Sequence, residues 1–178
     1  MITLTPTRLH WLNDDGDDPS DLCAHSPVLL EVNGTALVTP ADGDVTVSAA
    51  AVFLLRTLEC DHTPEQPVGD QLFPCCGHAM FDTGEDDVVI CGCNSGPDLS
   101  VVHQTDGLVQ LQTPGGKAAR VPLTDWREAV IHFCDQVSAF YDAALPKRRT
   151  SDDFGGFEKM MTEWRRRRQL AETRRNSV

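Results

Sequence analysis

The stretch TDWREAVIHFCDQVSAFYD, residues 124–142, carries the clearest secondary-structure pattern in the chain. Apolar side chains recur in it at the three- and four-residue spacing of one helix face, and they are Trp126, Ala129, Val130, Phe133, Val137, Phe140 and Tyr141. Thr124 or Asp125 can cap the helix, with Glu128 as the capping-box partner of Asp125. Since a helix with one apolar face must bury that face, we predict that Thr124–Asp142 packs on a sheet.

The residues that precede this helix predict antiparallel strands joined by short turns. Asp106-Gly107 and Asn33-Gly34 are typical two-residue hairpin turns, because these residues tolerate the positive φ angles of such turns. The predicted strands are, in chain order, Val28–Val32, Thr35–Thr39, His78–Asp82, Val88–Cys91, Ser100–Gln104, Leu108–Gln112 and Ala118–Pro122. Those from Cys75 to Pro122 follow one another closely and predict an antiparallel β meander.

Two further helices complete the predicted fold. Val47–Cys60, capped by Thr46 or Ser48, is apolar nearly all round, which is typical of a helix buried at the centre. Ser151-Asp152-Asp153 can begin a helix near the C-terminus, whose apolar stripe is Phe157, Met160, Met161 and Trp164. We therefore predict an α+β fold, with an antiparallel β meander, two packed helices and a C-terminal amphipathic helix.

The charge of the chain is divided unevenly at Pro146. The whole chain has 178 residues and a net charge of −12. Residues 1–146 carry 22 acidic and five basic side chains, whereas residues 147–178 carry ten basic and five acidic ones. We predict a single acidic α+β domain over 1–146 and a mobile basic helical tail over 147–178. The tail can bind an anionic surface, the acidic domain itself, or a second copy in a homodimer.

Composition argues against several classes of protein. The acidic domain would repel the phosphates of nucleic acid, although this argument does not extend to the tail. No apolar run approaches the roughly 20 residues that a membrane span requires. The first 21 residues lack the basic start and apolar centre of a secretory signal. With seven cysteines, an odd number, we expect free thiols or metal ligands in a reducing cytoplasm.

Two short segments rich in cysteine and histidine predict a metal site. If the hairpin turns at Gly84-Glu85, His78 lies opposite Cys91 and Cys76 lies opposite Cys93. Three thiolates and an imidazole then meet on one face of two strands, a set that suits tetrahedral zinc. A shift of one residue in register would separate them. Cys75 replaces Cys76 as a ligand if its strand begins late.

Two other interpretations of these cysteines remain open. They can be inert thiols that pack as small hydrophobic side chains. They can also include a redox or catalytic thiol, with His62 or His25 nearby as a base. The position of His62 after a helix has a simpler explanation, because a histidine at a helix C-terminus interacts favourably with the helix dipole.

The chain resembles an uncharacterised family of bacterial proteins over residues 20–145. The motifs that carry this resemblance are Asp21-Leu-Cys-Ala-His25, Leu54-Leu-Arg-Thr-Leu58, Asp61-His62-Thr63, Pro74-Cys-Cys-Gly-His78 and the helix from Val130 to Tyr141. It implies no particular activity. Cys91–Tyr141, a short meander followed by a helix, is also similar in pattern to small toxin-immunity proteins, which implies an acidic binding protein without catalysis.

The leading functional hypothesis is a non-catalytic cytoplasmic bacterial protein, immunity-like, whose acidic surface binds a basic protein partner. The first alternative is a small zinc protein in which Cys76, His78, Cys91 and Cys93 hold the ion mainly for structure. The second alternative is a thiol- or metal-dependent enzyme.

Overall fold

The computed structural model describes residues 1–12, 16–93, 95–148 and 155–176. Its largest sheet contains β1 (Ile2–Pro6), β2 (His25–Val32), β3 (Thr35–Val38) and β4 (Asp44–Thr46). Strand β2 is central, since it pairs antiparallel with each of the other three. The predicted Asn33-Gly34 hairpin is confirmed, and these residues have φ angles of 50° and 83°. Strands β1 and β4 are not among the predicted strands, although Ile2–Thr5 of β1 alternates apolar and polar residues.

The remaining strands form two further sheets rather than one meander. Strands β5 (Ala79–Phe81) and β6 (Val89–Cys91) pair with each other, while β7 (Ser100–His103), β8 (Leu108–Gln112) and β9 (Ala118–Pro122) form a three-stranded sheet. All these pairs are antiparallel, which confirms the predicted α+β class. The two sheets separate because Gly92, Pro97 and Asp98, which follow β6, bond to residues 70–73 instead of continuing the strand.

Two helices form the centre of the core. Helix α1 (Val47–Arg56) is buried along its whole length, and it ends before the predicted Cys60. Helix α2 (Leu123–Asp142) matches its prediction to within one residue, but Pro122 occupies the cap position and no side chain caps the helix start, so the predicted cap is wrong. The Trp126 indole joins the two helices by donating to Thr57 Oγ1 at 3.0 Å.

Helix α3 (Gly156–Arg175) packs on this core instead of extending from it. Met160 and Trp164 of the predicted stripe are buried, and Phe157 and Met161 are partly buried. The helix begins directly against β5, since a Cβ at Gly156 would collide with the Met80 carbonyl. The predicted start at Ser151-Asp152-Asp153 lies outside the described residues.

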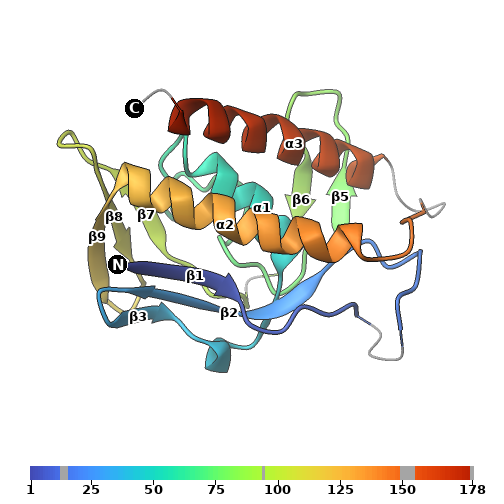
Figure 1. Ribbon diagram of the computed structural model, residues 1–178, viewed down its shortest axis with the longest axis horizontal. Coiled ribbons are helices and arrows are strands. Elements are labelled where there is room, and N and C mark those ends of the chain that lie inside the picture. Colours follow the sequence, from blue (N-terminus) through green and yellow to red (C-terminus); the bar gives the residue numbers. More distant parts are fainter. Residues whose placement is uncertain (13–15, 94, 149–154, 177–178) are drawn as a thin grey trace.

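Figure 1 shows how these layers are arranged. Helix α1 lies behind α2 and α3, the sheet of β1, β2 and β3 lies below α2, and the β5–β6 pair lies behind α3. The contacts agree with this view, since α2 packs on β1 and α3 packs on α1, α2 and β5. Among the described residues, no helix combines the length and the apolar character that crossing a membrane requires.

A buried carboxylate fixes α3 on the core. The Glu163 side chain is fully buried, and it accepts hydrogen bonds from the Arg56 guanidinium at 2.8 Å and from Arg167 Nε at 2.7 Å. It also accepts the backbone N–H of Val88 at 2.8 Å. Arg56 donates further to the Val68 and Val88 carbonyls. One carboxylate therefore ties α3 to the end of α1 and to Val88, the residue immediately before β6.

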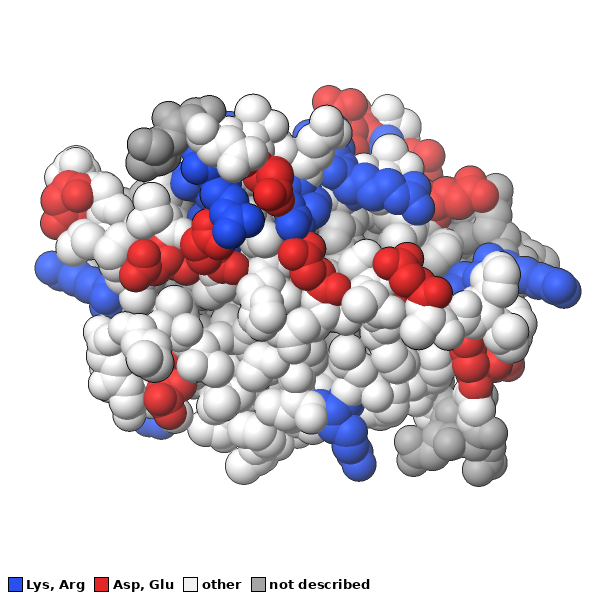
Figure 2. All heavy atoms as spheres, viewed as in Figure 1, with Lys and Arg blue, Asp and Glu red and all other residues white. Residues whose placement is uncertain are grey.

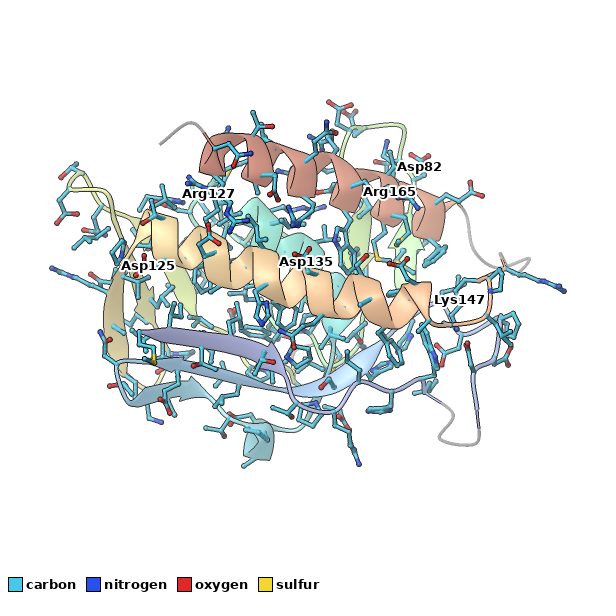
Figure 3. The ribbon with its side chains drawn as sticks, viewed as in Figure 1. Asp82, Asp125, Arg127, Asp135, Lys147 and Arg165 are labelled. Carbon is cyan, nitrogen blue, oxygen red and sulfur yellow. A yellow bond between two sulfur atoms is a disulfide. The ribbon has the colours of Figure 1, made fainter. Side chains whose placement is uncertain are left out.

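Ion pairs surround this buried network and join the basic tail to the acidic domain. Acidic and basic side chains alternate along the boundary between α2 and α3 in Figure 2, and Figure 3 labels Asp135 of α2 on that boundary. The pairs are Arg166–Asp87, Arg167–Asp87, Arg167–Glu59, Arg168–Asp135, Arg175–Glu128, Lys159–Asp82 and Lys147–Asp17. The tail thus uses many of its positive charges within its own chain.

We predict that Glu163→Gln destabilises the protein by about 3 to 5 kcal/mol, because it leaves the buried Arg56 and Arg167 cations without their shared anion. Urea unfolding monitored by circular dichroism measures this change. The matched control is Glu65→Gln, at an exposed loop position, which should change stability by less than about 0.5 kcal/mol. Equal stabilities for the two variants would contradict the role given to Glu163.

Candidate thiol and imidazole sites

Two chain segments that are distant in sequence lie side by side and bring cysteines together. They are residues 70–76, before β5, and residues 92–93 and 95–98, after β6. Gly92 N–H donates to Asp70 Oδ2 at 3.0 Å, and Phe73 N–H donates to the Pro97 carbonyl at 3.2 Å. Gly96 allows the close approach, since a Cβ there would collide with the backbone of the first segment.

A buried histidine and an aspartate help to hold these two segments in place. His62 Nε2 lies 2.9 Å from Asp98 Oδ1, and the same oxygen accepts the Leu72 N–H at 2.9 Å. Burial opposes ionisation of Asp98, but the hydrogen bonds from His62 and Leu72 outweigh it and lower the pKa of this carboxyl. His62 Nδ1 accepts the Val68 N–H at 3.1 Å, so both ring nitrogens are engaged. His62 therefore positions the loops and is not available as a base for a thiol.

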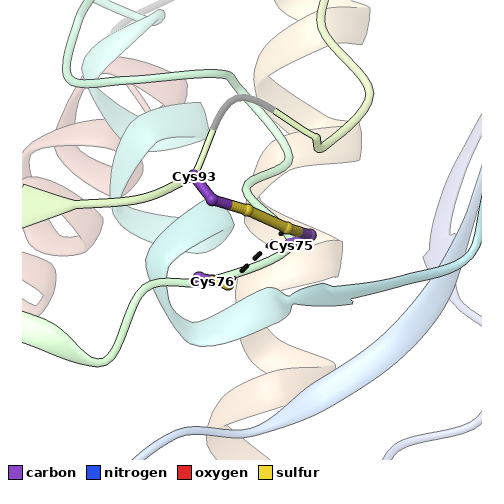
Figure 4. Close-up of side chains that lie close together, drawn as sticks. All are labelled: Cys75, Cys76 and Cys93. Atoms are coloured by element: carbon purple, nitrogen blue, oxygen red, sulfur yellow. Dashed lines mark hydrogen bonds between the residues drawn. A yellow bond between two sulfur atoms is a disulfide. The ribbon is translucent and has the colours of Figure 1, made fainter.

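Cys75, Cys76 and Cys93 form the thiol cluster (Figure 4). Their three sulfur atoms all lie within 4.8 Å of one another, and this is the one group of three or more potential metal ligands gathered so closely in the described part of the chain. Cys75 and Cys93 are joined in a disulfide, and Cys76 Sγ lies 3.6 Å from Cys75 Sγ. The cluster could hold a metal ion once the disulfide is reduced.

The predicted set of four ligands is divided by the observed strand register. Ala79, rather than His78, pairs with Cys91, so the predicted register is wrong by one residue. Cys76 and Cys93 do lie close together, as members of the thiol cluster. Cys75 belongs to the same cluster, because β5 begins only at Ala79 and residues 75 and 76 do not alternate as in a strand. Cys91 is an exposed residue outside the cluster. His78 packs against His25 on the side of β2.

The cysteines outside the thiol cluster form no disulfide, and they are of two kinds. Cys23 and Cys134 are buried, whereas Cys60 and Cys91 are exposed. Burial raises the pKa of the Cys134 thiol, and its sulfur lies 3.7 Å from the Ala51 carbonyl. The interpretation as inert packed thiols therefore fits the buried pair, and the disulfide departs from the expectation that all seven cysteines are free or metal-bound.

Three histidines form a second cluster, the imidazole row of His10, His25 and His78. The ring centroids of His10 and His25 are 5.8 Å apart, and those of His25 and His78 are 5.0 Å apart. His25, in the middle, is 5% exposed, and its buried Nε2 has no hydrogen-bond partner among the described residues. Burial, together with the neighbouring His78, lowers the pKa of His25 to about 4. A neutral ring is therefore held at the centre of the row.

No protein-family model, curated protein or solved structure matches this chain. The resemblance to an uncharacterised bacterial family and the likeness to immunity proteins therefore remain predictions from sequence. Functional inference rests on the thiol cluster, the imidazole row and the charges of the chain itself.

We predict that replacing His25 makes the free energy of unfolding less dependent on pH. The pKa of His25 is 6.5 in the unfolded chain and about 4 in the folded protein, so the unfolded chain binds more protons between these values. The contribution of His25 to the free energy of unfolding is complete above pH 6.5 and is lost as the pH falls to about 4.

Urea unfolding at neutral pH and at about pH 5, with a chelator present, measures the effect. The wild type should lose more stability over this range than His25→Asn. His132→Asn, an exposed position on α2, is the control and should behave as the wild type does. If the stability of His25→Asn falls with pH as much as that of the wild type, this ring does not couple folding to pH.

Proposed function

We propose that this protein binds a zinc ion through Cys75, Cys76 and Cys93 when the Cys75–Cys93 disulfide is reduced. The observation that carries the proposal is the gathering of three sulfur atoms within 4.8 Å. Thiolates are soft ligands that select zinc over magnesium or calcium. The first alternative from the sequence, a zinc protein, is thus retained with a changed ligand set.

The spacing of the sulfur atoms supports this ligand set. In a tetrahedral site the Zn–S bonds of about 2.3 Å place the sulfur atoms about 3.8 Å apart. The observed separation of 3.6 Å between the sulfurs of Cys75 and Cys76 is close to that value. The hydrogen bonds that Asp70 and Asp98 accept hold the two cysteine segments together, so the sulfur atoms need only small movements to reach the tetrahedral spacing.

Metal binding and disulfide formation compete for the same two sulfur atoms. When a small-molecule disulfide oxidises the zinc-bound protein, Cys75 and Cys93 lose two electrons, form their S–S bond and release the ion. The oxidant takes up these two electrons and two protons to become two thiols. Three protein ligands also leave a fourth position for water or for an external ligand. The proposed protein is therefore a redox-dependent zinc binder.

We predict that the thiol cluster of the reduced protein, purified without a metal-affinity tag, binds one zinc ion per chain. Competition with a chromophoric chelator measures the affinity. Cys76→Ser and Cys93→Ser should each weaken binding by more than about tenfold, because each removes a thiolate ligand. Oxidation of Cys75 and Cys93 to the disulfide should abolish zinc binding at the thiol cluster.

Cys91→Ser is the matched control, because Cys91 belongs to the set predicted from sequence but lies outside the thiol cluster. It should bind zinc as the wild type does. Loss of binding in Cys91→Ser would favour the original set of Cys76, His78, Cys91 and Cys93. Less than about 0.1 zinc per reduced chain would exclude both sets.

We infer, as a second candidate function, that the protein binds a basic protein partner in the cytoplasm, as an immunity-like binding protein would. Its support is the charge that remains after the tail has docked. Exposed carboxylates outside the ion pairs described above, within the described residues, include Asp42, Glu65, Glu85, Asp86, Asp106, Asp125 and Asp142. Complementary charge would accelerate association with a basic protein.

We predict that this candidate partner is recovered from the native host at low salt and lost at high salt, because screening weakens attraction between exposed charges. The measurement is a pull-down with the full chain, followed by identification of the bound proteins and their isoelectric points. Glu85→Lys combined with Asp86→Lys should reduce recovery. Recovery that is insensitive to salt, or a partner that is itself acidic, would count against this function.

A further inference from the structure

We propose that His10, His25 and His78 form a second metal site, which binds a divalent transition-metal ion such as Zn²⁺ or Cu²⁺ through imidazole nitrogen. This inference is independent of the thiol cluster, because it uses different residues. Imidazole is a ligand for zinc, copper and nickel, whereas calcium and magnesium prefer oxygen.

The backbone holds the first two histidines of the row firmly together. His10 and His25 form an antiparallel bridge, in which each N–H donates to the other's carbonyl at 2.9 Å. His25 also pairs with Thr46 of β4. His78 immediately precedes β5 and packs its ring on His25. Three separate parts of the chain therefore present imidazoles to one place.

The spacing of the rings fits ligands of a single ion. Because Zn–N bonds are about 2.0 Å long, two imidazoles on a tetrahedral ion have ring centroids about 5 Å apart. The observed centroid separations are 5.0 Å for His25 and His78 and 5.8 Å for His10 and His25. The ring nitrogens are not gathered within 4.8 Å as the three sulfurs are, so binding requires the rings to turn. The exposed ring of His78 has room to do so.

The buried nitrogen of His25 supplies a second, independent observation. Buried polar atoms in proteins nearly always have a hydrogen-bond partner, and an exception requires an explanation. His25 Nε2 is such an exception among the described residues. A metal ion between His25 and its neighbours would provide the missing interaction.

The Trp11 carbonyl and the Asp44 carboxylate orient the His10 ring. Its Nδ1 lies 2.9 Å from the Trp11 carbonyl, which can only accept, so Nδ1 carries a proton. Its Nε2 lies 3.2 Å from Asp44 Oδ1, which also only accepts, so a metal ion bound here would replace the proton on Nε2. A histidine that donates Nδ1–H to a carbonyl and directs Nε2 at an ion is the usual arrangement in metal sites. The Asp44 carboxylate adds negative charge that would attract the cation.

The test separates this site from the thiol cluster by removing the latter. The full chain with Cys75→Ser, Cys76→Ser and Cys93→Ser is titrated with zinc chloride. Histidine ring nitrogens are followed by two-dimensional nuclear magnetic resonance, and calorimetry gives the stoichiometry. We expect one ion per chain, with ring shifts at His10, His25 and His78.

Matched variants decide which histidines hold the ion. His78→Gln, at an exposed position, should weaken binding by at least about tenfold, and His25→Gln should do the same if circular dichroism shows it folded. His132→Gln on α2 is the control and should bind normally. Absence of zinc binding, ring shifts confined to His103 or His132, or normal binding by His78→Gln would each overturn the proposal. None of these results affects zinc binding by the reduced thiol cluster.

Discussion

The buried carboxylate of Glu163 is the interaction on which the arrangement of the remaining parts depends. It joins α3 to Arg56 at the end of α1, and Arg56 in turn holds the carbonyls of Val68 and Val88. The Val68 carbonyl lies just before the segment that begins at Asp70, and the Val88 carbonyl lies just before β6, which leads into the second cysteine segment. The helix that closes the core and the loops that gather the thiols therefore share one anchor. Because a buried carboxylate needs all of its partners, α3 has a single favourable position along α1.

Local patterns in the sequence were sufficient to predict the helices and hairpins that are determined by residues close together in the chain. The periodicity of residues 124–142 predicted α2, and hairpin dipeptides predicted β2–β3 and β7–β8. The opposite charges of domain and tail made docking of the tail within the chain one of three alternatives, beside another anionic surface and a second copy. The burial of Glu163 was not predictable in the same way. Because the four arginines 165–168 follow it closely, Glu163 has the pattern of a solvated helix face, and only the position of Arg56 makes it part of the core.

The thiol cluster shows why a metal site was harder to predict than a helix. The turn between β5 and β6 is long, so the sequence does not fix which residues oppose each other, and the true register differs by one. The partners of Cys75 are set instead by contacts between segments about 20 residues apart, such as Asp70 with Gly92. The same shift moved His78 from the thiols to His25. Sulfur and imidazole side chains that lie close together in sequence thus contact different parts of the chain.

The Cys75–Cys93 disulfide encloses the whole β5–β6 hairpin, on which the start of α3 rests. In the oxidised protein this hairpin is a covalent ring, and a ring restricts the unfolded chain as well as the folded one. Proteolytic cleavage within residues 76–92 would therefore leave both fragments in one molecule, and only a reductant would release them.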